Sequence, residues 1–118
     1  MSPFLFTDAI LNNRPIKVFN NGDMLRDFTY IDDIVEGVIR VLDHTATSNV
    51  DWNAATPDPA TSTAPYRIYN IGNSSPVKLM DFIKAIETAC GHEADKNFLP
   101  MQPGDVYQTN ADTTLLQT

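Results

Sequence analysis

The chain has 118 residues, a formal net charge of −7 at pH 7 and 42% hydrophobic residues, which is enough for one small domain with a small core. The acidic balance argues against nucleic acid and membrane surfaces as partners, because both repel a negatively charged protein. No apolar run has the length of a membrane span or a secretory signal, so we expect a cytoplasmic protein. Cys90 is the single cysteine, which excludes an internal disulfide and the usual zinc sites.

The first part of the chain predicts a helix, a strand and a turn. Residues 4–12 carry apolar side chains at helical spacing, and Pro15 cannot continue that helix. Residues 16–19 alternate apolar and polar side chains, as a short strand does. The Asn-Gly pair within residues 20–23 predicts a turn, after which residues 28–31 return to extended structure.

A second helix is expected from the apolar stripe between Ile34 and Leu42. Asp32 or Asp33 is the expected N-cap, because its carboxylate can accept hydrogen bonds from the free amides of the first turn. The stripe is wide, so we expect this helix to be buried on more than one side.

Residues 45–65 are small or polar throughout, apart from Val50 and Trp52. Such a segment contributes little to a core, and long loops of this kind are usually functional or disordered. We therefore expect a flexible insertion loop at 45–65.

The last part of the chain predicts four short elements. Residues 66–72 have strand character, and residues 79–90 form an amphipathic helix with Gly91 just after its end. Residues 97–100 predict an edge strand, and residues 110–114 the start of a helix.

The motifs of common enzyme sites are absent from the printed sequence. There is no G-x-G-x-x-G turn, no Walker lysine, no G-x-S-x-G elbow and no Tyr-x-x-x-Lys pair. His44 and His92 lie too far apart in sequence to predict a metal site. We assign no catalytic and no metal-binding residue.

Three loop residues suit a polar, anionic ligand. Arg26 could hold a phosphate through its planar guanidinium, or it could be a surface arginine paired with Asp27 or Asp23. Phe19 could stack on a nucleobase, although an aromatic residue at a strand end is more often part of a core. Asp105, in Pro-Gly-Asp, could accept from ribose hydroxyls or could simply form a turn.

Four stretches, taken in order, resemble the C-terminal part of an extended short-chain dehydrogenase/reductase, in the NAD-dependent nucleotide-sugar epimerase and dehydratase family. The stretches are residues 6–11 with 18–19, the run Arg26-Asp27-Phe28-Thr29-Tyr30-Ile31-Asp32-Asp33-Ile34, residues 69–73, and residues 102–106 with 111–112. The resemblance implies an α/β fold: a small mixed α+β substrate-binding part of an extended Rossmann-type protein, without the N-terminal dinucleotide-binding half.

The resemblance is strongest to the UDP-glucuronate 4-epimerase branch. Residues 60–73, with the low-complexity segment before them, are similar to that branch. Residues 99–106 point the same way, because UDP-galactose 4-epimerases usually carry arginine where Gln102 stands.

Carried over residue by residue, the resemblance implies a UDP-sugar site. Val18 and Phe19 would border the uracil, Arg26 would bind the diphosphate, Gln102 would lie near the phosphate and Asp105 would bind the ribose. Gln102 is neutral where many relatives carry a second arginine, which argues against a two-arginine clamp.

The family places its NAD-binding fingerprint and its catalytic group upstream of residue 1. The parent enzyme would oxidise C4 of the sugar with NAD, let the 4-keto sugar turn over, and return hydride to the other face. We therefore expect this chain alone to be inactive, with NAD bound by the N-terminal half. Apolar surface on residues 34–42 and 66–71 should be exposed and should favour self-association.

Two alternatives stay open. One is a nucleotide-sugar 4,6-dehydratase or another 4-epimerase, which only the preferred sugar nucleotide would distinguish. The other is a free-standing binding or interaction module without an enzymatic parent.

Overall fold

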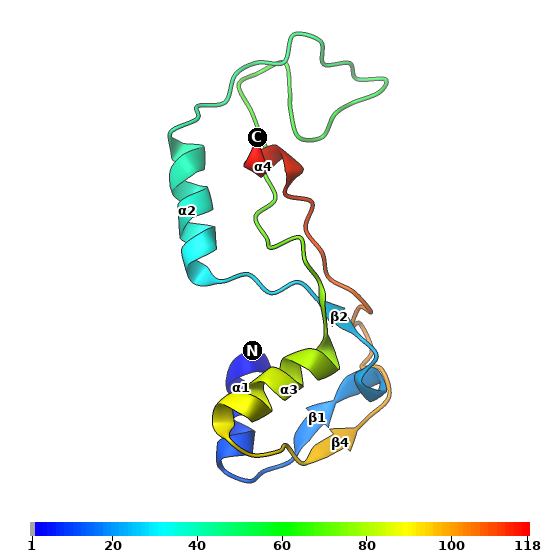
Figure 1. Ribbon diagram of the computed structural model, residues 1–118. Helices are drawn as coiled ribbons and strands as arrows, with labels where there is room; N and C mark the ends of the chain where they lie inside the picture. Colours follow the sequence, from blue (N-terminus) through cyan, green and yellow to red (C-terminus); the bar gives the residue numbers. More distant parts are fainter. Residues whose placement is uncertain (1) are drawn as a thin grey trace. The chain divides into compact units, whose positions relative to one another are not determined.

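A computed structural model describes residues 2–118 as a mixed α/β chain in two compact units (Figure 1). The first unit consists of Met1–Asp27 and Ser75–Thr109, and the second of Phe28–Ser74 and Asn110–Thr118. The first unit is therefore assembled from two segments that the second unit separates in the sequence.

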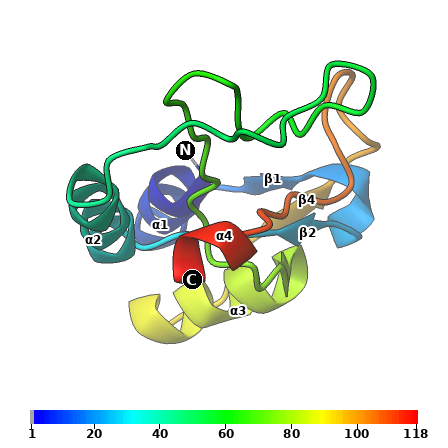
Figure 2. The ribbon, with the colours of Figure 1, turned by 90° about the horizontal axis from the view of Figure 1, so that it is seen from above.

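The first unit pairs four short strands in two ladders. Strand β1 runs parallel to β4, with Ile16 opposite Lys96 (Figures 1 and 2). Strand β2 runs antiparallel to β3, with Leu25 opposite Lys78. The elements of the unit are α1 (Ser2–Leu11), β1 (Ile16–Val18), the 3₁₀ helix η1 (Phe19–Gly22), β2 (Leu25–Arg26), β3 (Val77–Lys78), α3 (Leu79–Cys90) and β4 (Lys96–Phe98).

The core of the first unit is small and lies between α1, β1 and α3. Its three most buried large side chains, Ile10, Val18 and Ile83, come one from each of these elements. The other buried apolar residues are Phe6, Ile16, Met24 and Leu79. The helical spacing of α1 and α3 thus serves to bring one apolar face of each helix onto the strand.

Two predictions for the first unit are confirmed and one is wrong in detail. Helix α3 covers Leu79–Cys90, and Gly91 follows it with a left-handed φ of 82°, as the sequence predicted. The strand predicted for residues 16–19 ends at Val18, because Phe19 already begins η1. Within η1, Asn20 and Asn21 have φ of 50° and 51°, values that asparagine tolerates better than most residues.

The second unit contains helix α2 (Ile31–Leu42) and the short helix α4 (Thr114–Gln117). The predicted capping role of Asp32 or Asp33 is wrong. Tyr30 occupies the N-cap position with extended backbone, and no side chain caps the helix. Asp32 and Asp33 instead lie in the first turn, where their carboxylates interact favourably with the positive end of the helix dipole.

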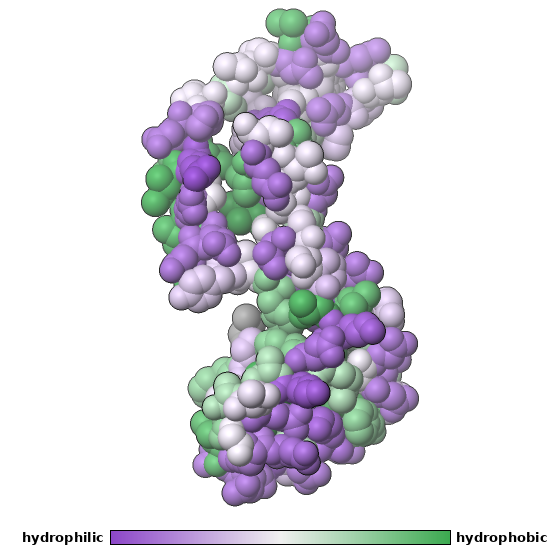
Figure 3. Space-filling view, in the orientation of Figure 1, coloured by the Kyte–Doolittle hydropathy of each residue, from purple (hydrophilic) through white to green (hydrophobic). Residues whose placement is uncertain are grey.

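The expectation that α2 is buried on several sides is also wrong. Gly37 is its one buried residue, and a Cβ placed there would lie 3.6 Å from side-chain atoms of Ile71 and Leu116. Most of the apolar stripe is exposed, at Val35, Val38, Ile39 and Leu42, and so is Ile31 just before it, whereas Ile34 and Val41 are partly buried. The stripe contributes to the green surface over α2 in Figure 3.

Residues 66–72 do not form the predicted strand. Within the described residues, this segment contributes one isolated antiparallel bridge, between Arg67 and Thr61. Residues 45–65 form turns in which asparagine and aspartate side chains accept backbone hydrogen bonds, as Asn49 does from the amide of Asp51. Flexibility of this loop stays a prediction.

Replacing Gly22 by alanine should destabilise the first unit. Gly22 has a φ of 83°, and an added Cβ would lie 2.5 Å from Met80 Sδ. The unfavourable backbone and the overpacking together predict a loss of about 2–4 kcal/mol in the free energy of unfolding. Urea denaturation checks this, with Gly104→Ala as a control that shares the positive φ but meets no atom within 4 Å. Equal losses in both variants would contradict the packing argument.

The exposed stripe of α2 should drive association at high protein concentration, because clustered apolar side chains gain free energy when they leave water. Sedimentation velocity at increasing concentration should show a rising average mass. Val35→Ser with Val38→Ser should reduce the rise, whereas Asp58→Ser, in the polar loop, should not. A single monomeric species for the unchanged protein at every concentration would contradict this expectation.

Candidate functional site

Strand β2 carries Arg26 and is paired along both of its sides. On one side β2 pairs with β3. On the other side the Leu25 amide donates to the carbonyl of Tyr107 at 2.9 Å, and the Thr109 amide donates to the carbonyl of Leu25 at 3.2 Å. The two residues of β2 are therefore held between β3 and residues 107–109.

The guanidinium of Arg26 makes contacts with both terminal nitrogens. Nη1 donates to the carbonyls of Leu25 at 2.8 Å and Tyr107 at 3.1 Å. Nη2 donates to Asp105 Oδ1 at 3.0 Å and contacts Met24 Sδ at 3.7 Å. The side chain is 18% exposed, so its orientation is fixed while part of its surface stays open to solvent. Its ion-pair partner is Asp105, not the neighbouring aspartates that the surface interpretation named.

Asp105 combines a turn role with a charge role. Its amide donates to the carbonyl of Gln102 at 3.1 Å, which closes a turn, and its Oδ1 accepts from the Val106 amide at 2.9 Å. The same oxygen faces Arg26, and the side chain is 29% exposed. The turn-forming interpretation and the polar-ligand interpretation of Asp105 are thus compatible.

The other predicted residues lie in the same unit but differ in exposure. Val18 is fully buried in the core, so its side chain has no exposed surface. Phe19 is partly buried at the start of η1, and Gln102 is exposed. Backbone hydrogen bonds join β1 and η1 to Leu99, which precedes the turn of Gln102: the Leu99 amide donates to Val18, and the Asn21 amide donates to Leu99.

The sequence did not single out Tyr107 as a site residue. Its hydroxyl donates to Asp23 Oδ1 at 3.2 Å, and this hydrogen bond raises the pKa of Tyr107 above its ordinary value. Its carbonyl is the acceptor shared by the Leu25 amide and Arg26. No local sequence signal could have revealed contacts between residues so distant along the chain.

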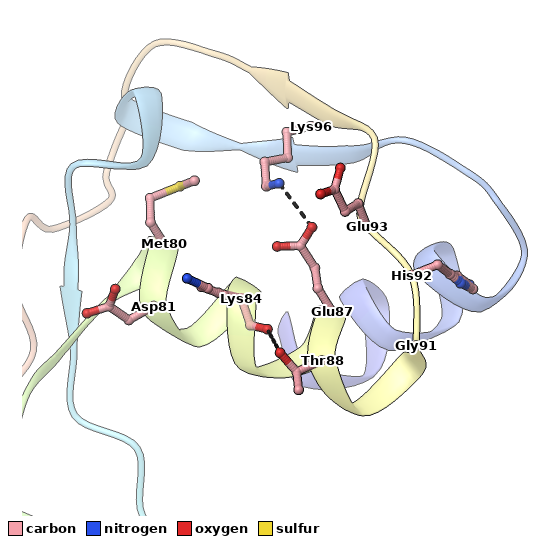
Figure 4. Close-up of a pocket in the computed structure, with 9 residues that line it drawn as sticks. All are labelled: Met80, Asp81, Lys84, Glu87, Thr88, Gly91, His92, Glu93 and Lys96. Carbon is pink, nitrogen blue, oxygen red and sulfur yellow. Dashed lines mark hydrogen bonds and ion pairs between the residues drawn. The ribbon is translucent and has the colours of Figure 1, made fainter.

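A separate groove of the first unit lies along α3 and contains none of the five predicted site residues (Figure 4). Its central feature is Glu87, which accepts from the Ala94 amide at 2.8 Å and from Lys96 Nζ at 3.1 Å. These hydrogen bonds, led by that of Ala94, hold the pKa of Glu87 below its ordinary value. The groove thus contains the ion pair that ties α3 to β4.

Within residues 2–118, the histidine, cysteine and carboxylate side chains form no group of three that could hold a metal ion. None of the helices described has both the length and the hydropathy needed to cross a membrane.

Comparison with known protein families identifies the class of protein to which this chain belongs. The model of the NAD dependent epimerase/dehydratase family matches residues 3–72, which is more than half of the chain. The chain therefore belongs to the NAD-dependent epimerase/dehydratase family, as the motif resemblance indicated.

Individual relatives narrow the comparison. The chain is 54% identical over 112 residues to the protein CapI of Staphylococcus aureus, and 47% identical over 121 residues to a probable UDP-glucuronate 4-epimerase of Rhizobium meliloti. These matches cover 95% and 99% of this chain but 34% and 35% of the relatives. The chain spans about a third of the length of the curated relatives it matches.

A solved structure gives the same result. The UDP-glucuronic acid 4-epimerase of Bacillus cereus, in complex with UDP-glucuronic acid and NAD, matches with a TM-score of 0.75 and 28% identity. The match covers 99% of this chain and 32% of that protein. The fold is thus that of about a third of a Rossmann-type epimerase, as the sequence predicted.

The lowered pKa of Glu87 predicts a pH-dependent contribution to stability. Because the folded state favours the carboxylate, this contribution is complete above the unfolded pKa and is lost as the pH falls through the lower, folded pKa. Glu87→Gln should reduce the free energy of unfolding at pH 7 by roughly 1–3 kcal/mol, since it removes a charged acceptor from Ala94 and Lys96.

Denaturation of the two proteins from pH 7 to pH 3 checks this, and their difference should narrow as the pH falls. Glu93→Gln, in the same groove, controls for the change in net charge. A difference that stays constant over the whole range would contradict the assignment.

Proposed function

We propose that this chain forms the UDP-sugar-binding part of an NAD-dependent UDP-glucuronate 4-epimerase. The observation that carries the proposal is the pair of Arg26 and Asp105, held at 3.0 Å on backbone that β2 and the 107–109 segment fix. The pair combines a cation for a diphosphate with a carboxylate for ribose hydroxyls.

Ligand binding would redistribute the partners of this pair. Both N–H groups of Arg26 Nη1 point at backbone carbonyls, so a diphosphate oxygen would compete for Nη2, which now donates to Asp105. The released Asp105 oxygen would accept from a ribose hydroxyl. Each charged group would exchange one partner for another and would not remain unpaired, which limits the cost of opening the ion pair.

Local charge sets the strength of the proposed site. The chain is acidic, and UDP-glucuronate carries negative charge on its diphosphate and on its carboxylate, so binding depends on local positive potential. Arg26 supplies that potential, and the proposed neighbour Gln102 adds hydrogen bonding but no charge. We therefore infer that loss of Arg26 cannot be compensated by Gln102.

The uracil end is proposed to lie at η1. The partly buried ring of Phe19 offers an apolar surface there, on a backbone whose turn is tied to Leu99. Val18 is buried, so its proposed role is to anchor the end of β1 and thereby to fix the position of Phe19.

We propose that NAD is bound outside residues 2–118, because these residues lack the chemistry of a pyrophosphate site. A dinucleotide pyrophosphate is bound by a glycine-rich turn at a helix N-terminus. Here α2 begins after Tyr30 and α3 after Lys78, and the first turns of these helices carry Asp32, Asp33 and Asp81, which repel a pyrophosphate. We assign no hydride-transfer step to this chain, and its proposed role is binding.

The choice of UDP-glucuronate among sugar nucleotides is supported by the relatives. One curated relative at 47% identity is a probable UDP-glucuronate 4-epimerase, and the solved UDP-glucuronic acid 4-epimerase matches nearly the whole chain. The pair of this chain that supports the proposal, Arg26 and Asp105, would contact the diphosphate and the ribose of the nucleotide.

Calorimetric titration with UDP tests the proposal. Arg26→Ala should weaken binding by roughly 1.5–3 kcal/mol, the scale of a charge-assisted hydrogen bond. Arg14→Ala, which removes an exposed arginine paired with Asp8, is the matched control and should bind like the unchanged protein. Equal UDP affinity in the Arg26→Ala variant and the unchanged protein would contradict the proposed diphosphate role.

A further inference from the structure

Tyr107 connects two parts of the polar network around Arg26. Its hydroxyl donates to the carboxylate of Asp23, on the chain just before β2. Its carbonyl accepts from the Leu25 amide and from Arg26 Nη1. The backbone carbonyl of Tyr107 therefore accepts a hydrogen bond from Arg26, and the side chain of Tyr107 ties the same residue to Asp23.

We propose that Tyr107 is a positioning residue for Arg26, with its hydroxyl bond to Asp23 fixing the carbonyl that orients the guanidinium. The binding consequence rests on the proposed function, whereas the positioning itself concerns this protein without ligand.

The contacts of Arg26 make this carbonyl important. Of the acceptors around the guanidinium, the carbonyl of Leu25 belongs to the adjacent residue. Asp105 is the partner that a diphosphate would replace in the proposed function. The Tyr107 carbonyl is then the remaining oxygen acceptor from outside β2, and it would keep its bond to Nη1 throughout binding.

The tyrosine ring is well suited to this role. Tyr107 is 48% exposed, so removing its hydroxyl leaves no buried cavity and has little effect on core packing. Thr109, two residues further on, is attached independently: its hydroxyl accepts from the Asp27 amide at 2.9 Å and its amide donates to Leu25. Loss of the hydroxyl should therefore loosen residue 107 without detaching the segment.

The first test needs no ligand. In ¹⁵N-labelled protein, NMR measures the rate of rotation about the Cζ–Nε bond of Arg26. Hydrogen bonds made by the two terminal nitrogens slow this rotation. Tyr107→Phe should speed this rotation by about two- to fivefold, the effect of losing one solvent-exposed hydrogen bond. Asp23→Asn keeps an acceptor oxygen for the tyrosine and should behave like the unchanged protein. Unchanged rotation in Tyr107→Phe would overturn the proposal.

The second test compares UDP with uridine by calorimetry. Tyr107→Phe should weaken UDP binding by about two- to fivefold and leave uridine binding unchanged, because the diphosphate is the group proposed to meet Arg26. In an Arg26→Ala background the same substitution should have no effect on UDP. Tyr66→Phe, an exposed tyrosine of the second unit, is the matched control.

Equal losses for UDP and uridine, or a loss that persists without Arg26, would overturn the positioning role. Failure of the unchanged protein to bind UDP would refute the proposed function instead. In that case the rotation of Arg26 still decides whether Tyr107 positions it.

Discussion

The organisation of the first unit depends on the pairing of β2 with two segments that lie far away in the sequence. Two residues cannot form a stable strand alone, because their amides and carbonyls need partners on both sides. Val77–Lys78 supply one side, and residues 107–109 supply the other. Arg26 takes its orientation from this arrangement, and so does its distance from Asp105.

The first unit has a core and the polar network, whereas the second unit exposes much of its apolar surface. Every buried apolar residue named for the core belongs to the first unit, and α2 buries only Gly37. The difference explains why the burial predicted for α2 from its helical pattern is wrong. Periodicity identifies which side chains share a face, but it does not say whether anything covers that face.

Much of the fold could be predicted from local chemistry. Gly91 ends α3 because glycine tolerates positive φ, and Asn-Gly marks the turn before β2. The errors concern features set by distant partners. Residues 66–72 have strand composition, but the described residues give them only the bridge at Arg67. Asp32 and Asp33 have capping chemistry, but the N-cap is Tyr30, two residues before Asp32, so both carboxylates lie inside the first turn.

The residues of the candidate site divide in the same way, into those that residue type and motif predict and those whose roles depend on distant partners. Arg26 and Asp105 stand out by residue type and by motif, and the structure brings them together. Tyr107 and Asp23 carry no such signal, because their roles arise only when segments 84 residues apart meet. The buried Val18 shows the converse: a residue placed at the site by its motif can act there only through the backbone that it anchors.

The discontinuous first unit has a consequence for biosynthesis. Its parallel β1–β4 ladder and its β2 pairings join segments on either side of residues 28–74. The ribosome must therefore synthesise residues 28–74 and then Ser75–Thr109 before all strands of the first unit can pair. Until then α1 and β1 emerge with their apolar faces uncovered, and closing the long intervening loop adds an entropic cost that slows folding. The nascent chain is thus most exposed to misassociation before α3 and β4 leave the ribosome.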